Sequence, residues 1–142
     1  ILEFGAGDGV ITEEILRQMG PGDRLLVFEI NPEFCDHLRK IEDPRITVFE
    51  ESAENAGRIL ENLGLDQADL IISAIPFLLF PKHEALRLVS EFKNLLRPGG
   101  RFIQLHYSLN LKEDYEEIFD EVRIRFVPIN IPPAFIFECR KK

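Results

Sequence analysis

The sequence has little cysteine and no long hydrophobic run. Its 142 residues include two cysteines, Cys35 and Cys139, which form neither a paired motif nor a metal-binding spacing. We interpret both as small buried side chains in a reducing compartment, which favours a cytoplasmic protein. The longest apolar stretch, residues 70–80, is shorter than the roughly 18 residues that a membrane span needs. We therefore expect neither a bound metal nor a transmembrane helix.

Basic residues are too few for a nucleic-acid-binding surface. The chain has 17 Lys and Arg against 25 Asp and Glu, a formal net charge of −8. Most of the deficit lies in residues 1–70, with 16 acidic and 6 basic side chains. Nucleic-acid binders usually carry a basic stripe, because contacts with phosphates supply most of the non-specific affinity. We therefore do not expect a nucleic-acid partner.

The length and composition indicate one globular domain. Hydrophobic residues make up 45% and charged residues 30% of the chain, which is ordinary for a folded soluble domain. The sequence has no initiator methionine and opens inside a buried strand. We expect a single domain over residues 1–142 whose N-terminal segment is missing.

Strand and helix patterns alternate along the chain. Short apolar runs predict strands at residues 1–4, 24–30, 46–49, 69–75, 101–107, 122–127 and 134–140. Helical patterns lie between them at residues 10–19, 32–40, 53–63, 81–96 and 112–119, and Arg97–Gly100 predicts a turn. This alternation predicts an α/β fold. It is a doubly wound, mostly parallel seven-stranded sheet with helices on both faces and an antiparallel final strand.

A glycine-rich loop follows the first strand. Gly5, Gly7 and Gly9 permit positive φ and let a ligand approach the backbone, and the next helix directs its N–H groups to the same place. Such loops bind dinucleotides or S-adenosylmethionine. The dinucleotide fingerprint needs Gly or Ala where this chain has the bulky Val10, and Asp8 puts a negative charge where a pyrophosphate would lie. A nicotinamide-dependent dehydrogenase is therefore the disfavoured alternative.

Two carboxylates near this loop are candidate binding groups. Glu29 ends the second strand, where a carboxylate can accept hydrogen bonds from both hydroxyls of a ribose. Glu3 is a lone acid inside a buried strand and needs a partner there. We expect Glu3 to reach the ammonium group of the ligand through the loop backbone or a water.

The chain resembles class I S-adenosylmethionine-dependent methyltransferases. The resemblance is carried, in the family's order, by Leu2-Glu3-Phe4-Gly5-Ala6-Gly7-Asp8-Gly9, Phe28-Glu29-Ile30-Asn31, Asp69-Leu70-Ile71-Ile72-Ser73 and Leu96-Arg97-Pro98-Gly99-Gly100-Arg101-Phe102. It implies a Rossmann-like sheet of order 3-2-1-4-5-7-6 with strand 7 antiparallel. It also implies S-adenosyl-L-methionine as cofactor and S-adenosyl-L-homocysteine as product.

The resemblance implies which residues contact this cofactor. The glycine loop would lie against the methionine part, Glu29 would bind the ribose, Ile30 would flank the adenine, and Glu51 would bind the adenine amino group. The full set of candidate cofactor-binding residues is Glu3, Phe4, Gly5, Ala6, Gly7, Glu29, Ile30, Asn31, Glu51, Ser52, Ala74 and Ile75.

The segment after the fourth strand bears on the methyl acceptor. Enzymes that methylate amino groups of bases, including ribosomal RNA adenine dimethyltransferases, carry Asn or Asp, one further residue, Pro and an aromatic residue there. This chain keeps Pro76 and Phe77 but has Ala74 at the polar position, and an alanine side chain cannot hold an amine. A methyltransferase acting on ribosomal RNA or another base is therefore an alternative and not the preferred function.

A closer resemblance is to bacterial phospholipid N-methyltransferases. It is carried by Ile75-Pro76-Phe77-Leu78-Leu79-Phe80-Pro81, by Gly100-Arg101-Phe102-Ile103-Gln104 with Tyr107, and by Asn130-Ile131-Pro132-Pro133-Ala134. It implies N-methylation of an amine such as a phosphatidylethanolamine-type headgroup, with peripheral membrane contact and an acyl route along residues 77–80. The candidate substrate-binding residues are Pro76, Phe77, Phe80 and Asn130.

The end of the fifth strand holds the candidate catalytic residue. An amine acceptor must lose its proton before it attacks the methyl group. His106 and Tyr107 are strand neighbours that face opposite ways, so only one points toward the site. The resemblance favours Tyr107, which would orient the amine through its hydroxyl or ring face. Because no base is evident, a catalytically silent module that only binds the cofactor is a second hypothesis.

Overall fold

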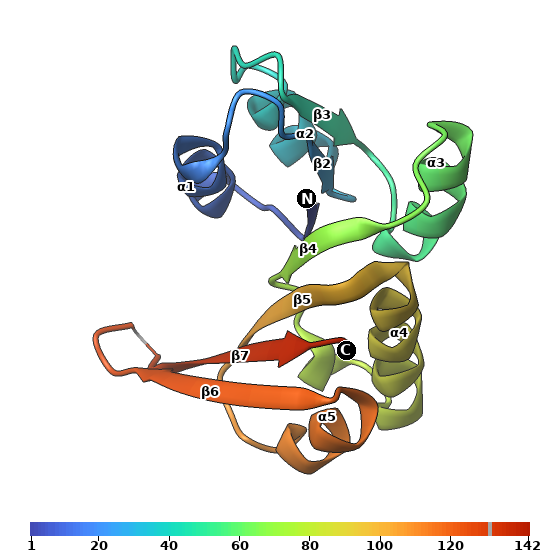
Figure 1. The fold of residues 1–142 in the computed structure, drawn as a ribbon. Helices are drawn as coiled ribbons and strands as arrows, with labels where there is room; N and C mark the ends of the chain where they lie inside the picture. Colours follow the sequence, from blue (N-terminus) through green and yellow to red (C-terminus); the bar gives the residue numbers. More distant parts are fainter. Residues whose placement is uncertain (131) are drawn as a thin grey trace. The chain divides into compact units, whose positions relative to one another are not determined.

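The computed structural model describes residues 1–130 and 132–142, which form two compact units (Figure 1). Unit 1 is Ile1–Leu65 and unit 2 is Asp66–Lys142. Within the described residues, the strands follow the order β3-β2-β1-β4-β5-β7-β6. This order and the antiparallel direction of β7 confirm the predicted Rossmann-like α/β fold. The single domain over residues 1–142 stays a prediction.

Unit 1 alternates strand and helix, as its sequence pattern predicts. Its elements are β1 (Leu2–Phe4), α1 (Val10–Gln18), β2 (Leu25–Phe28), α2 (Pro32–Leu38), β3 (Ile46–Phe49), the short 3-10 helix η1 (Ala53–Asn55) and α3 (Ala56–Asn62). The three strands pair in parallel. Every residue of β1 and β2 is buried, and all of them except Glu3 are apolar, as in a parallel strand that is covered on both faces.

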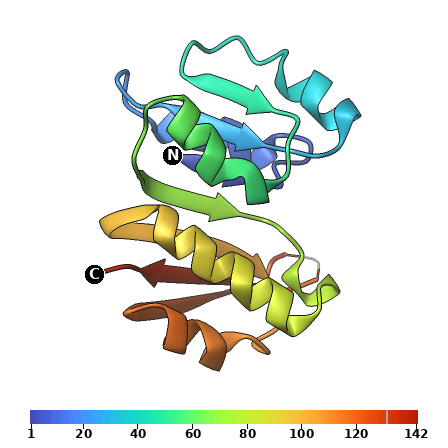
Figure 2. The same ribbon diagram turned by 90° about the vertical axis from the view of Figure 1, so that its right-hand side faces the viewer.

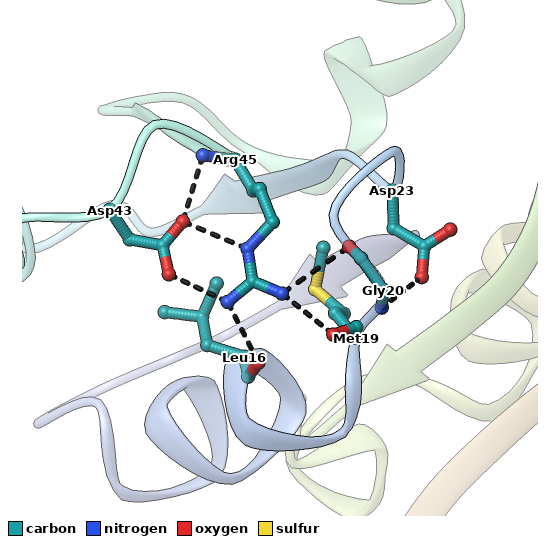
Figure 3. A network of polar contacts seen from close by, with 6 residues as sticks. All are labelled: Leu16, Met19, Gly20, Asp23, Asp43 and Arg45. Carbon is teal, nitrogen blue, oxygen red and sulfur yellow. Dashed lines mark hydrogen bonds and ion pairs between the residues drawn. The ribbon is translucent and has the colours of Figure 1, made fainter.

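Arg45, just before β3, fixes the last turn of α1 (Figure 3). Its guanidinium donates hydrogen bonds to the backbone oxygens of Leu16 at 2.9 Å and Met19 at 2.8 Å. Carbonyls at the end of a helix lack partners inside it, so these bonds satisfy them. Arg45 also binds the Asp43 carboxylate at 2.7 Å, and these hydrogen bonds lower the pKa of Asp43 to about 2. The end of α1 away from the glycine loop is thereby anchored.

Unit 2 ends in an antiparallel hairpin. Its elements are β4 (Ala68–Ser73), the 3-10 helix η2 (Phe77–Leu79), α4 (Lys82–Leu95), β5 (Leu96–His106), α5 (Lys112–Ile118), β6 (Glu121–Val127) and β7 (Ala134–Arg140). β4 and β5 are parallel, and β7 runs antiparallel to both β5 and β6. α4 and α5 lie on one face of these strands (Figure 2). No helix in the described residues has the length and apolar character to cross a bilayer.

Aromatic side chains form much of the core of unit 2. Phe102 on β5 stacks on Phe119 with ring centroids 5.6 Å apart, and Tyr115 on α5 meets Phe137 edge-on at 5.3 Å. Alternate residues of β5 point into this core, which buries Gln104 and His106 beside Phe102. The core side of β5 is therefore fixed by packing against α4, α5 and β7.

The predicted turn at Arg97–Gly100 is wrong, because this segment lies inside β5. Ala68 of β4 pairs with Leu96, but Leu70 pairs with Arg101, so the register shifts across the four intervening residues. Gly99 takes a φ of 79°, and its N–H donates to the backbone oxygen of Lys141 at 2.6 Å. The glycines therefore form a bulge that stays paired, and β5 begins earlier than predicted.

Gly100 should be the least replaceable position of this bulge. An added Cβ would stand 2.8 Å from the backbone oxygen of Arg97 and 3.3 Å from that of Asp69, and neither oxygen can move without distorting the strands. We expect Gly100→Ala to lower the free energy of unfolding by about 1–3 kcal/mol in urea denaturation. Gly22→Ala is the control, because a Cβ there meets nothing within 4 Å. An unchanged urea midpoint for Gly100→Ala would contradict the bulge geometry.

Candidate cofactor and acceptor sites

The glycine loop takes the backbone conformation that its sequence predicts. Gly5, Gly7 and Gly9 have φ values of 71°, 57° and 90°, a region that residues with a Cβ seldom adopt. A Cβ on Gly9 would stand 3.0 Å from the Leu38 side chain of α2, so this glycine allows close packing. A Cβ on Gly7 would meet no atom within 4 Å. Gly7 therefore leaves open space on the loop.

The bulk of Val10, which the fingerprint counts against a dinucleotide, does not affect how α1 packs. Val10 is 68% exposed, and α1 packs through Thr12, Ile15 and Leu16 instead. Asp8 also disfavours a pyrophosphate at this loop. The Asp8 carboxylate accepts a hydrogen bond from the N–H of Val10 at 3.3 Å, so a negative charge already occupies the start of α1.

Glu29 links the loop after β1 to the loop after β2. Its Oε1 accepts a hydrogen bond from the N–H of Gly7, and its Oε2 accepts one from the N–H of Asn31, both at 2.8 Å. Asn31 in turn caps α2 by accepting from the N–H of Glu33 at 2.9 Å. Each Glu29 oxygen has a second lone pair. The carboxylate can therefore hold both loops and still accept two hydrogen bonds from a ligand.

Glu3 binds a side chain of α1, which the sequence did not indicate. Its Oε2 accepts a hydrogen bond from the Thr12 hydroxyl of α1 at 2.7 Å. Its Oε1 is buried and has no hydrogen-bond partner among the described residues. Burial raises the pKa of Glu3 to about 7, against the lowering effect of the Thr12 hydrogen bond, and the nearby charge of Glu29 raises it further. Glu3 is thus poised between its neutral and charged forms near neutral pH.

The remaining cofactor candidates of unit 1 differ in the exposure and contacts of their side chains. Glu51 follows β3 and accepts a hydrogen bond from the Asn55 side chain at 2.8 Å, and Ser52 caps η1. Ile30 is 72% exposed, whereas Phe4 is fully buried against Phe28 with ring centroids 5.4 Å apart. The structure thus gathers these candidates at the carboxyl ends of β1, β2 and β3. Their contacts with a cofactor stay predictions.

Gln104 holds the loop after β4, a role that sequence reasoning missed. Its Nε2 donates to the backbone oxygens of Ile75 and Leu105, both at 2.9 Å. The Ser73 hydroxyl accepts from the N–H of Ile75 at 3.2 Å. Gln104 is fully buried, and its Oε1 has no partner among the described residues. A polar residue inside an apolar strand was the available signal.

The aromatic acceptor candidates Phe77 and Phe80 are buried and partly buried, respectively. Phe77 is buried, with its ring centroid 6.0 Å from that of Phe80 and 6.4 Å from those of Phe92 and His106. The neighbouring Leu78 and Leu79 are exposed. Packing within unit 2 therefore accounts for Phe77, and the exposed part of this apolar run is its centre.

His106 is the last residue of β5, and Tyr107 follows it directly, so the predicted strand over residues 101–107 ends one residue earlier. His106 is buried, and its Nε2 lies 3.0 Å from the Tyr115 hydroxyl. Burial lowers the pKa of His106 to about 4, so this imidazole is neutral at neutral pH. Tyr107 is 53% exposed at the carboxyl end of the strand. The side chain that remains accessible is thus Tyr107, and its catalytic role stays a prediction.

The acceptor candidate on the β6–β7 loop is Asn130. Its side chain is exposed and donates to the backbone oxygen of Pro132 at 2.9 Å. Ile131, which belongs to the segment carrying the lipid methyltransferase resemblance, lies outside the described residues. The β6–β7 loop starts where Val127 pairs with Ala134, so it adjoins the strand that pairs with β5.

Comparison with known proteins identifies the family. A family profile described as a methyltransferase domain matches residues 1–100. The chain belongs to this methyltransferase family. An ornithine lipid N-methyltransferase of Singulisphaera acidiphila is 34% identical over 143 residues, which cover 99% of this chain and 74% of that protein.

Solved structures share the fold of this methyltransferase. A magnesium protoporphyrin IX methyltransferase from Synechocystis PCC 6803 with bound SAM has a TM-score of 0.72 at 14% identity, over 99% of this chain and 69% of that one. A spermidine synthase in complex with the transition-state analogue AdoDATO has a TM-score of 0.73 at 16% identity, over 99% of this chain. This chain spans about half of that synthase (52%).

These findings confirm the predicted class of enzyme and its cofactor. The protein is an S-adenosyl-L-methionine-dependent methyltransferase, which argues against a silent binding module and against a dehydrogenase. The residues of unit 1 fit that cofactor. Gly7 leaves open space on the loop, Glu29 keeps a lone pair on each oxygen, and the buried Oε1 of Glu3 has no partner among the described residues.

Glu29→Ala should weaken the binding of S-adenosyl-L-homocysteine by about 1–3 kcal/mol, because a hydrogen-bonding carboxylate is lost. Calorimetric titration of the purified protein measures this difference. Glu33→Ala is the matched control, since Glu33 is an exposed acid two residues beyond Asn31. Equal affinities for wild type and Glu29→Ala would show that Glu29 only organises the loops.

Glu3 should make the stability of the cofactor-free protein depend on pH. Its pKa is higher in the folded state (about 7) than in the unfolded chain (4.5), so the folded state holds the proton more tightly. The free energy of unfolding therefore falls as the pH rises from 4.5 to 7. Glu3→Gln removes this loss. Urea denaturation should show that the free energy of unfolding of Glu3→Gln, minus that of wild type, rises by about 2–3 kcal/mol between pH 4.5 and pH 7. A constant difference would contradict the raised pKa.

Proposed function

We propose that this methyltransferase transfers methyl groups from S-adenosyl-L-methionine to the amine of a lipid headgroup. The observation that carries the proposal is the 34% identity to an ornithine lipid N-methyltransferase over 99% of the chain. The acceptor segment supports it. Residues 70–81 contain no charged side chain, and Ala74 stands where enzymes acting on bases carry a polar residue. An apolar segment of this kind suits an acceptor with acyl chains.

Unit 1 would hold the cofactor. Gly5, Ala6 and Gly7 would face its methionine part, because this backbone is free of bulky side chains. The Glu29 carboxylate would accept hydrogen bonds from the ribose, and the exposed Ile30 would cover the adenine. Glu51 would bind the adenine amino group with a lone pair that its Asn55 hydrogen bond leaves free. The bound cofactor supplies an electrophilic methyl group on a sulfonium ion, so the protein has mainly to position the nucleophile.

Unit 2 would orient the amine. The exposed ring and hydroxyl of Tyr107 can bind an ammonium through the ring face or an amine through the oxygen. Gln104 fixes the backbone of Ile75, and with it the start of the segment that carries Pro76 and Phe80. Asn130 would contact the headgroup from the β6–β7 loop with its exposed amide.

The acceptor's proton would leave to water. The segments after β4 and β5, residues 74–81 and 107–111, contain neither Asp nor Glu. His106 is buried, and with a pKa of about 4 it is a poor base at neutral pH. The reaction rate should therefore follow the fraction of neutral amine in the substrate, and it should rise with pH until that amine is deprotonated.

The acceptor can be identified by following labelled methyl groups from S-adenosyl-L-methionine. We expect the purified protein to label ornithine lipid or phosphatidylethanolamine in mixed micelles, and to leave ribosomal RNA unlabelled. Tyr107→Phe should reduce kcat by about tenfold if the hydroxyl orients the amine, and it should leave the affinity for S-adenosyl-L-homocysteine unchanged. Labelling of RNA in preference to both lipids would overturn the proposal and restore the base-directed alternative.

A further inference from the structure

Three segments of unit 2 combine apolar side chains with a complete lack of charge. Residues 70–81, 102–111 and 126–137 contain no Asp, Glu, Lys or Arg, although 30% of the chain is charged. Each segment includes the carboxyl end of a strand or the loop that follows it: β4, β5 and β6, respectively. All three uncharged segments of unit 2 therefore lie at, or directly after, the carboxyl end of a strand.

Each of these segments exposes large apolar side chains. Leu79 on η2 is 83% exposed and Ile129 on the β6–β7 loop is 91% exposed. We define the apolar edge as the exposed aliphatic and phenyl side chains of the three segments, which are Leu78, Leu79, Leu109, Phe126, Val127 and Ile129. Exposed apolar side chains mark a binding surface where they gather in one place, because leaving a continuous apolar surface in water costs free energy.

The strand pairing places these residues along one edge of unit 2. Ser73, the last residue of β4, pairs with Gln104 near the end of β5. His106 at that end pairs with Phe135 of β7, and Phe135 pairs with Phe126 of β6. Figure 2 shows the loop after β4 and the β6–β7 loop on the same side, toward which the β4 arrow points. The three segments therefore lie at the same edge of unit 2.

We infer that the apolar edge is a surface that inserts into the headgroup layer of a lipid bilayer. The inference rests on the proposed function, because the candidate acceptor residues Tyr107 and Asn130 belong to the same segments. An amine in a lipid headgroup is reached when the edge that carries them faces the bilayer. The side chains sit on separate loops, and a fluid bilayer can accommodate them without the shape complementarity that a protein partner requires.

The charge distribution determines the kind of bilayer that fits. Unit 2 offers no net attraction to anionic lipids, because it carries 11 Lys and Arg against 11 Asp and Glu and the apolar edge itself contains no charged residue. Binding must therefore come from burial of apolar surface in zwitterionic lipid. Such binding should not weaken when the ionic strength rises from about 0.1 M to about 1 M, whereas electrostatic binding would be screened.

Flotation with vesicles of pure phosphatidylcholine tests the inference. These lipids carry no free amine, and no cofactor is added, so the result does not depend on the identity of the methyl acceptor. We expect wild-type protein to float with the vesicles at low and high salt. The double variant Leu79→Ser/Ile129→Ser should reduce the partition coefficient about tenfold or more, because two large apolar side chains are lost. Both positions are mostly exposed, so the fold should tolerate the changes.

Leu63→Ser is the matched control, since Leu63 is a 40% exposed leucine of unit 1. It should float like wild type. The inference is overturned if wild type does not float, if the double variant floats as well as wild type, or if Leu63→Ser loses as much. Sedimentation velocity adds a further outcome. A wild-type dimer that the double variant abolishes, without vesicle binding, would assign the apolar edge to contacts between two copies of the chain.

Discussion

A single carboxylate holds together the part of unit 1 on which cofactor binding depends. Glu29 accepts one backbone hydrogen bond from the glycine loop after β1 and one from the loop after β2. Both loops follow buried strands whose positions are already fixed by parallel pairing. The carboxylate therefore converts two flexible turns into one rigid surface before any ligand arrives, and less conformational entropy is lost on binding.

Periodicity and glycine placement carried the prediction of the fold. Apolar runs such as Leu25–Phe28 are long enough to be covered on both faces and too short for a core helix, so strand assignment there was secure. The segment Arg97–Gly100 was predicted as a turn and is part of β5, because Pro and Gly are common both in turns and in bulges. Strand pairing decides between the two, and pairing depends on residues far away in the sequence, here Asp69 and Lys141.

Sequence spacing pointed to candidate site residues but not to their contacts with one another. Spacing located Glu29 and the glycine loop, since each follows a predicted strand. It did not show that Val10 points outward, that Thr12 binds Glu3, or that Gln104 fastens Ile75. Those facts depend on which side of a helix or strand meets the core, and packing with distant segments settles this. Packing with distant segments also decides that His106 is buried and Tyr107 is exposed.

The two ends of α1 are secured by groups with very different acidities. Arg45 binds the end of the helix, and its partner Asp43 has a pKa of about 2. Thr12, in the first turn, is bound to Glu3, whose pKa is about 7. A change of pH near neutrality thus leaves the Arg45 contacts at the C-terminal end of α1 in place and alters the charge of Glu3 at its N-terminal end. The titration of Glu3 therefore acts at the end of α1 that follows the glycine loop, and the contacts at the opposite end do not depend on it.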